Sequence, residues 1–227
     1  MKKTIAILAA AVAGTSLVNA QELSISTTVA WESDYVFRGV QLAEEYFAPS
    51  IDISYGDFYA GIWAALPVDA MYGNEVDFYA GYGVGLSETV SADFGFTYYT
   101  YPDAGDEFFD SVNTFEIYGG LSFEAPLSPS VYVFYDFDLE ALTIEASGGH
   151  SVEISEEGTV DFSAYLGYVD ADGFDWYYYG LGVALTHSFT DNASASVGVN
   201  WYGSEEDTMF GGDDNEIAYG VSFSAGF

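Results

Sequence analysis

The chain has 227 residues and a formal net charge of −33, because 36 acidic residues face only three lysines and arginines. Such a chain has almost nothing with which to neutralise phosphates, so nucleic acid is excluded as a natural partner. Half of the residues are hydrophobic and 19% are aromatic. This composition argues against the disorder expected of a highly charged chain with few hydrophobic residues.

Residues 1–20 have the features of a secretory signal. Lys2 and Lys3 form a basic start, a short apolar run follows, and Val18-Asn19-Ala20 supplies small or modest side chains at the expected cleavage site. The apolar run is too short for a transmembrane helix, which needs about 20 residues; this disfavours the alternative of a retained anchor. We predict Sec-type export with cleavage after Ala20, which leaves 21–227 as one domain. Cysteine is absent, so disulfides cannot stabilise the exported chain.

The exported chain repeats one pattern, an alternation with period two that is broken by Gly, Asp, Asn, Ser and Pro clusters. This pattern predicts an all-β domain of about twelve strands. The expected strands cover residues 22–40, 46–55, 57–66, 74–87, 89–101, 112–124, 130–139, 142–154, 159–169, 175–189, 192–202 and 215–227.

The connections between these strands alternate in length. Short turns such as 56–57 and 87–88 alternate with connections that include the longer stretches 102–111 and 203–214. Outer-membrane barrels have short periplasmic turns and longer external loops. An even number of strands then places both termini in the periplasm, and the long loops, which are the most acidic segments, outside.

The two faces of each expected strand differ. In 74–87, Phe78 and Val84 lie on an apolar face, whereas Glu75 and Asp77 lie on a face rich in Gly and Tyr. A charge at the bilayer midplane costs about 2–4 kcal/mol for Arg or Lys and less for acids, so a lipid-facing surface excludes charges. The pattern predicts a transmembrane antiparallel up-and-down β-barrel. A soluble acidic β-sandwich is the alternative, and the small residues of the polar face argue against it.

A family resemblance begins in segment 33–40, which reads Ser-Asp-Tyr-Val-Phe-Arg-Gly-Val. This resembles the opening motif of the TorF-type porin family, Gram-negative proteins grouped as conserved hypothetical outer-membrane proteins (Gcw_chp). Further similar segments are 58–63, 75–82, 96–99 and 135–138. That family usually has a Ser before the Gln of the motif, which is missing here and leaves the local turn open. The resemblance implies an outer-membrane barrel and a pore, but no particular solute.

The end of the chain resembles the signal for outer-membrane assembly. Tyr219, Val221, Phe223 and Ala225 alternate up to the terminal Phe227. We therefore expect periplasmic chaperones and the barrel-assembly machinery as partners during biogenesis, and outer-membrane lipid around the folded chain. The alternative is that Phe227 is an ordinary core residue.

An acidic set should project into the lumen from different strands. Its members are Asp34, Asp52, Glu75, Asp77, Asp93, Glu116, Asp136, Glu145 and Asp161. Acidic rings favour cations, and a twelve-stranded barrel should be narrow, between the filled barrels of about eight strands and the wide porins of about sixteen. The sequence thus predicts a porin for small cationic or neutral solutes. The alternatives are a closed barrel, plugged by inward aromatics such as Tyr59 and Tyr79, that is structural or adhesive through its loops, or carboxylates that merely hydrate the interior.

Arg38 is the one lysine or arginine after residue 20. Counting by twos along 22–40 places it on the polar face, where we expect a forked pair with carboxylates. Two roles remain open. It either forms a constriction that grades solutes by charge, or it clasps the first strand to its neighbours, the interpretation that we prefer.

Enzymatic chemistry finds little support. His150 and His187 each precede a serine, and a twelve-stranded barrel with such residues is similar to the outer-membrane phospholipase. Adjacent residues of a strand point to opposite faces, so neither pair can form a dyad. We expect no catalytic residues.

Metal binding is weakly indicated at one turn. Asp170, Asp172 and Asp175 have the look of a calcium loop without its full spacing, and an Asp- and Gly-rich turn explains them equally well. We expect no resident cofactor, although the acidic external loops could bind Ca²⁺ or Mg²⁺ weakly.

Overall fold

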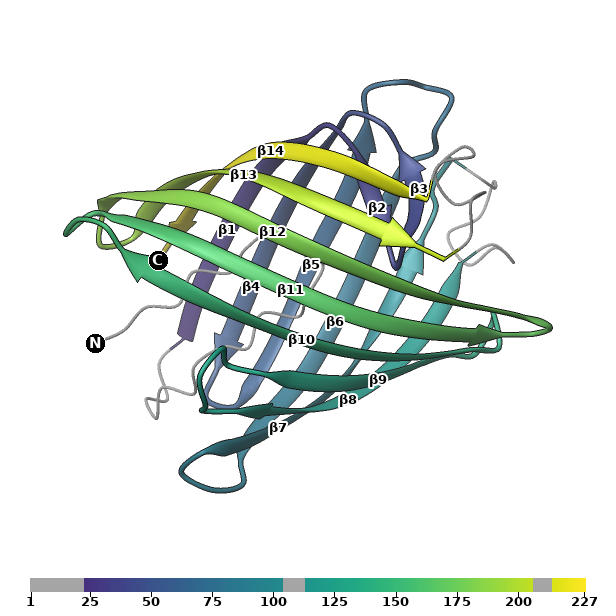
Figure 1. The fold of residues 1–227 in the computed structure, drawn as a ribbon, viewed down its shortest axis with the longest axis horizontal. Helices are drawn as coiled ribbons and strands as arrows, with labels where there is room; N and C mark the ends of the chain where they lie inside the picture. Colours follow the sequence, from purple (N-terminus) through teal and green to yellow (C-terminus); the bar gives the residue numbers. More distant parts are fainter. Residues whose placement is uncertain (1–22, 104–112, 206–213) are drawn as a thin grey trace.

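The computed structural model describes residues 23–103, 113–205 and 214–227, so the expected signal segment lies outside the described residues. These ranges form a closed barrel of twelve antiparallel strands, in which neighbours in sequence pair and β14 closes onto β1 (Figure 1). The predicted fold is confirmed. In the described ranges no helix is long and apolar enough to cross a membrane.

The strand bounds match the sequence pattern closely, with one exception. The barrel consists of β1 (Leu23–Glu32), β4 (Tyr46–Tyr55), β5 (Phe58–Pro67), β6 (Glu75–Gly85), β7 (Val90–Thr100), β8 (Thr114–Phe123), β9 (Ser130–Asp136), β10 (Ala141–Glu153), β11 (Gly158–Ala171), β12 (Phe174–Thr190), β13 (Ala193–Ser204) and β14 (Asn215–Gly226). A separate hairpin is formed by β2 (Tyr35–Phe37) and β3 (Val40–Ala43).

The exception is the first expected strand, 22–40, which is wrong beyond Glu32. The chain leaves the barrel wall there and turns back at Arg38 and Gly39, whose φ angles are 49° and 81°. Two consecutive residues with positive φ make the kind of tight turn that matches the twist of a two-stranded hairpin. The alternation continues through this turn, which is why the sequence pattern alone extended the strand.

The outside of the barrel is apolar. On β12, Leu181, Val183 and Leu185 are 42–53% exposed, whereas Ala184 and Thr186, which point to the other face, are 6% and 4% exposed. An exposed apolar surface that encircles the molecule is far larger than a soluble monomer carries, and it suits a lipid environment. The closed barrel also rules out the β-sandwich alternative.

The barrel has two distinct ends. The turn end carries the chain terminus Phe227, which pairs with Ile25 of β1, and the short turns such as 56–57. The loop end carries the β2–β3 hairpin and the connection 68–74 between β5 and β6 (Figure 1). The connection 137–140, between β9 and β10, also lies at the loop end.

Candidate functional site

The β2–β3 hairpin lies inside the barrel at the loop end. The hydroxyl of Tyr35 donates to Glu75 Oε1 of β6 at 3.2 Å, and Trp176 Nε1 of β12 donates to the carbonyl oxygen of Arg38 at 2.8 Å. β6 and β12 are six strands apart in the closed order of twelve. A segment that contacts both therefore spans the lumen.

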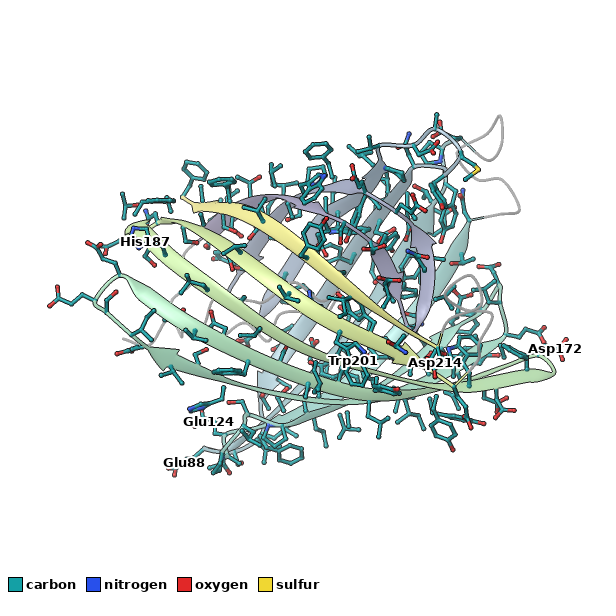
Figure 2. The ribbon with its side chains drawn as sticks, turned by 45° about the horizontal axis from the view of Figure 1, so that its top comes forward. Glu88, Glu124, Asp172, His187, Trp201 and Asp214 are labelled. Carbon is teal, nitrogen blue, oxygen red and sulfur yellow. The ribbon has the colours of Figure 1, made fainter. Side chains whose placement is uncertain are left out.

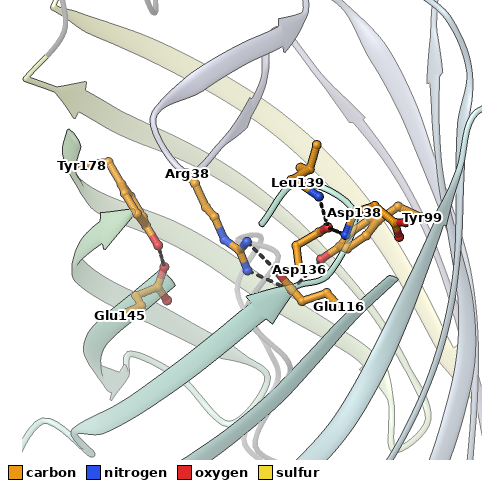
Figure 3. Close-up of polar contacts among 8 residues, drawn as sticks. All are labelled: Arg38, Tyr99, Glu116, Asp136, Asp138, Leu139, Glu145 and Tyr178. Carbon is orange, nitrogen blue, oxygen red and sulfur yellow. Dashed lines mark hydrogen bonds and ion pairs between the residues drawn. The ribbon is translucent and has the colours of Figure 1, made fainter. Parts of the chain in front are cut away.

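Arg38 forms the tip of this hairpin. Its Nη1 and Nη2 donate to Oε2 and Oε1 of Glu116 on β8, at 2.6 and 2.9 Å, in a forked ion pair (Figure 3). The guanidinium carbon lies 4.6 Å from the ring centroids of both Phe37 and Phe134, where each ring face attracts the cation. Tyr99 donates a further hydrogen bond to Glu116 Oε1 at 3.0 Å.

These surroundings keep Arg38 charged. Burial lowers the pKa of the guanidinium, but the charge and hydrogen bonds of Glu116 more than offset this, so the pKa lies above its ordinary value. The expected forked pair with a carboxylate is therefore present. Its predicted position on the wall of the first strand was wrong, because Arg38 reaches the lumen from the hairpin turn.

Gly39 allows the hairpin to approach the wall closely. A Cβ built at this position would lie 2.7 Å from Cβ of Tyr178 and 3.2 Å from Cβ of Ser204. Together with its φ of 81°, this leaves no room for another residue without a shift of the hairpin or of β12.

Two further acids of the predicted set accept hydrogen bonds at the depth of the hairpin. Asp34, at the base of the hairpin, accepts from Ser33 Oγ at 2.6 Å and from Gln41 Nε2 at 2.7 Å. Glu145 of β10 accepts from the hydroxyl of Tyr178 at 2.8 Å (Figure 3). Asp34 thus belongs to the hairpin and not to the barrel wall.

Asp136, Glu75 and Asp77 complete the acids at the loop end. Asp136 Oδ1 accepts from the backbone N–H groups of Asp138 and Leu139 at 2.9 and 2.8 Å, so it caps the turn after β9 (Figure 3). Glu75 and Asp77 lie on the inward face of β6 and are 4% and 7% exposed. Among the described residues, Asp77 Oδ1 has no hydrogen-bond partner.

The acids nearer the turn end are held by phenols. The hydroxyl of Tyr79 donates to Asp52. The hydroxyls of Tyr59 and Tyr132 donate to Asp93, at 3.0 and 3.3 Å. The carboxylates of Asp52 and Asp93 are half-buried. Each stays at the barrel wall because it accepts a hydrogen bond from a tyrosine of another strand.

Asp161 is bonded differently. Its Oδ2 accepts from the hydroxyls of Thr159 and Thr186, both at 3.0 Å, and its side chain is buried on the inward face of β11. Two threonine hydroxyls, one from β11 itself and one from β12, thus hold this carboxylate on the wall.

Inward tyrosines lie flat over glycines of the adjacent strand. A Cβ added at Gly81 would overlap the ring of Tyr59, and one added at Gly61 would overlap the ring of Tyr79. The same arrangement occurs in the pairs Tyr118–Gly95, Tyr132–Gly120, Tyr165–Gly180 and Tyr178–Gly167. Glycine thus keeps these rings along the wall and out of the centre of the lumen.

The family model described as "Bacterial protein of unknown function (Gcw_chp)" matches residues 18–219. The chain belongs to the Gcw_chp family. The narrower resemblance to TorF-type porins stays a prediction. None of the curated protein sequences matches this Gcw_chp chain.

Solved structures with the same fold are outer-membrane barrels. The KdgM porin is similar over 90% of this chain and 99% of its own, with 14% identity and a TM-score of 0.59. The COG4313 outer membrane channel from Pseudomonas putida F1 is similar over 94% of this chain and 98% of its own, with 8% identity and a TM-score of 0.58. The NanC porin is similar over 88% of this chain and 98% of its own, with 13% identity and a TM-score of 0.57. At these identities the likeness shows the fold of the Gcw_chp chain and not its solute.

The remaining predicted positions lie on the outside or at the rims. Asp170, Asp172 and Asp175 are exposed at the β11–β12 turn, where Tyr168 donates to Asp175 at 3.2 Å. Figure 2 shows Asp172 at the loop end and His187 toward the opposite end. In the described ranges, no three His, Cys, Asp or Glu side chains gather in a way that could hold a metal ion.

The aromatic residues that contact the hairpin tip were not predicted from the sequence. Phe134, Trp176 and Tyr178 of the barrel wall lie around this tip, and none of them was predicted as a site residue. A partial signal was present at Gly39, since two-residue hairpin turns need positive φ and glycine adopts it without steric cost. Arg38 before it is not one of the usual residues of such a turn.

Proposed function

We propose that this chain is an outer-membrane pore for passive diffusion of small cationic or neutral solutes. The observation that carries the proposal is the charge inside the barrel. Arg38 is the one lysine or arginine after residue 20, and Glu116 already neutralises it. The other inward carboxylates are left in excess, and an acidic lumen concentrates cations. Export by a cleaved signal into a Gram-negative outer membrane is part of the proposal.

The charge argues against one solute class of a protein with this fold. The KdgM porin is described in complex with a disordered oligogalacturonate, whose carboxylates make it an anion. The acidic lumen of the present chain would repel such a polyanion. We therefore propose that the present chain prefers cationic over anionic solutes.

The hairpin sets the narrow part of the proposed pore. At its level the inward Thr143, Glu116 and Tyr178 are at most 1% exposed, whereas Asp52 and Asp93 toward the turn end are half-buried. The two roles considered for Arg38 coincide in this arrangement, because the residue that clasps the hairpin to the wall also lies in the constriction.

Planar-bilayer recording of the refolded protein tests the proposal. We expect ohmic channels whose reversal potential in a KCl gradient has the sign of cation selectivity. Channels selective for anions, or a folded protein that never conducts, would contradict it.

The packed hairpin also favours a second candidate, a closed barrel that is structural or adhesive through its acidic external loops. Liposome-swelling measurements with uncharged and cationic solutes separate the two functions. Influx that depends on the inserted protein supports the pore, and its absence supports the closed barrel. An outer-membrane lipid hydrolase is not proposed, and a lipase assay with a His187→Ala control would test that decision.

A further inference from the structure

Two carboxylates on β6 lie buried without a counter-charge of their own. Glu75 and Asp77 are 4% and 7% exposed. Glu75 Oε1 accepts from the hydroxyl of Tyr35, but Asp77 Oδ1 has no partner among the described residues. Burial of carboxylates without a counter-charge is strongly unfavourable. Glu75 and Asp77 also share a side-chain hydrogen bond, which needs a proton between them. A pair with one proton keeps a single negative charge for a cation to neutralise.

The protein's own cation is not free to neutralise them. Both Nη groups of Arg38 are engaged by Glu116. The Glu116 carboxylate also lies close enough to Asp77 for their charges to repel, as does that of Glu75. Three carboxylates therefore share this part of the wall with one guanidinium.

The surroundings of Asp77 suit a monovalent cation. Its cross-strand neighbours are Trp63 on β5 and Tyr99 on β7, and the faces of aromatic rings attract cations. Ca²⁺ takes six to eight oxygen ligands, and no group of three acids that could chelate a metal ion exists within the described ranges.

We propose that Glu75 and Asp77 form a binding subsite for one monovalent cation, either an alkali-metal ion or the ammonium group of a small organic solute. The subsite lies beside the hairpin, in the narrow part of the lumen. The inference rests on the proposed function, because it specifies where a passing cation is held. Tyr35 links the subsite to the hairpin through its bond to Glu75.

Thermal unfolding of the folded, detergent-solubilised protein tests for binding without requiring an open pore. The melting temperature is measured in rising concentrations of potassium or methylammonium chloride, with N-methyl-D-glucamine chloride holding the ionic strength constant. A bound cation stabilises the folded state in a saturable manner, and the more effective salt identifies the source of the positive charge. The bulky reference cation should give no saturable rise.

Matched variants assign the effect to the subsite. Asp77→Asn should raise the half-saturating concentration at least about tenfold, and Glu75→Gln should act in the same direction if Asp77→Asn fails to fold. Asp161→Asn removes an equal charge from the lumen and should leave the half-saturating concentration unchanged. The proposal is overturned if neither salt outperforms the reference, or if the foldable β6 variants behave like the parent.

Conductance measured on the same preparations separates this inference from the pore itself. Saturable stabilisation in a protein that does not conduct keeps the subsite and contradicts the pore. Conduction without saturable stabilisation keeps the pore and overturns the subsite.

Discussion

The two halves of the lumen use the same alternating strands in different ways. At the loop end, the inward side chains pack against the β2–β3 hairpin and are buried, as Tyr178 and Glu116 are. Toward the turn end, Tyr59 and Tyr79 lie along the wall over Gly81 and Gly61 and stay half-exposed. An inward face therefore becomes a protein core where a segment fills it and a lining where glycine lets the rings lie flat.

The partners of the carboxylates also differ between the two halves. At the loop end the Glu116 carboxylate pairs with a guanidinium, whereas Oδ1 of Asp77 has no hydrogen-bond partner among the described residues. Toward the turn end Asp52 and Asp93 are satisfied by phenols. Charge is thus balanced locally only near the hairpin tip, and we expect selectivity and stability to depend most on the loop end.

Removal of the hairpin should have the largest effect, because it should abolish the difference between the two halves of the lumen. If residues 35–43 are replaced by a short Gly-Ser connection, the loop-end half should become a lining like the turn-end half, and single-channel conductance should rise several-fold. Circular dichroism provides the control that the barrel still forms. Unchanged conductance in a folded variant would show that the hairpin does not set the narrow part.

Loss of the charge at the hairpin tip should have the next largest effect. Arg38→Ala leaves Glu116 buried and unpaired, and breaking a buried ion pair in this way costs about 3–5 kcal/mol. We expect urea unfolding in detergent to show a loss of this order, together with a higher conductance. Reduced stability with unchanged conductance would leave Arg38 as a clasp and remove it from the constriction.

The partner substitution sharpens that result. Because Glu116→Gln removes the charge that Arg38→Ala would strand, the double variant should lose less stability than the sum of the two single variants. Additive losses in such a cycle would mean that the two side chains do not interact in the folded protein.

The close approach of the hairpin to the wall can be tested at Gly39. Gly39→Ala should destabilise the protein by about 1–3 kcal/mol in urea unfolding, from its positive φ and its contact with Tyr178. Gly173 is a matched control, since its φ is also 81° and an added Cβ there meets nothing within 4 Å. Equal losses in Gly39→Ala and Gly173→Ala would show that the contact with Tyr178 is unimportant.

The sequence alone was sufficient to predict the barrel but not the hairpin that lies inside it. Strand positions followed from period-two alternation, because lipid on one side enforces it over every strand. The forked pairing of Arg38 with a carboxylate was expected because the exported chain has no other lysine or arginine. Its partner Glu116 lies 78 positions away, and only barrel closure and the inward fold of 35–43 bring them together. Neither is encoded in local periodicity.

The smallest expected effect concerns the lining toward the turn end. A methyl group at Gly81 would overlap the Tyr59 ring, which must then swing away from the wall and toward the centre of the lumen. Gly81→Ala should therefore lower single-channel conductance modestly, in the direction opposite to hairpin removal. Gly85 is a matched control on the same face of β6, because an added Cβ there meets nothing within 4 Å. If Gly85→Ala lowers conductance as much as Gly81→Ala does, added volume alone is responsible, and the flat tyrosines do not keep this half of the lumen open.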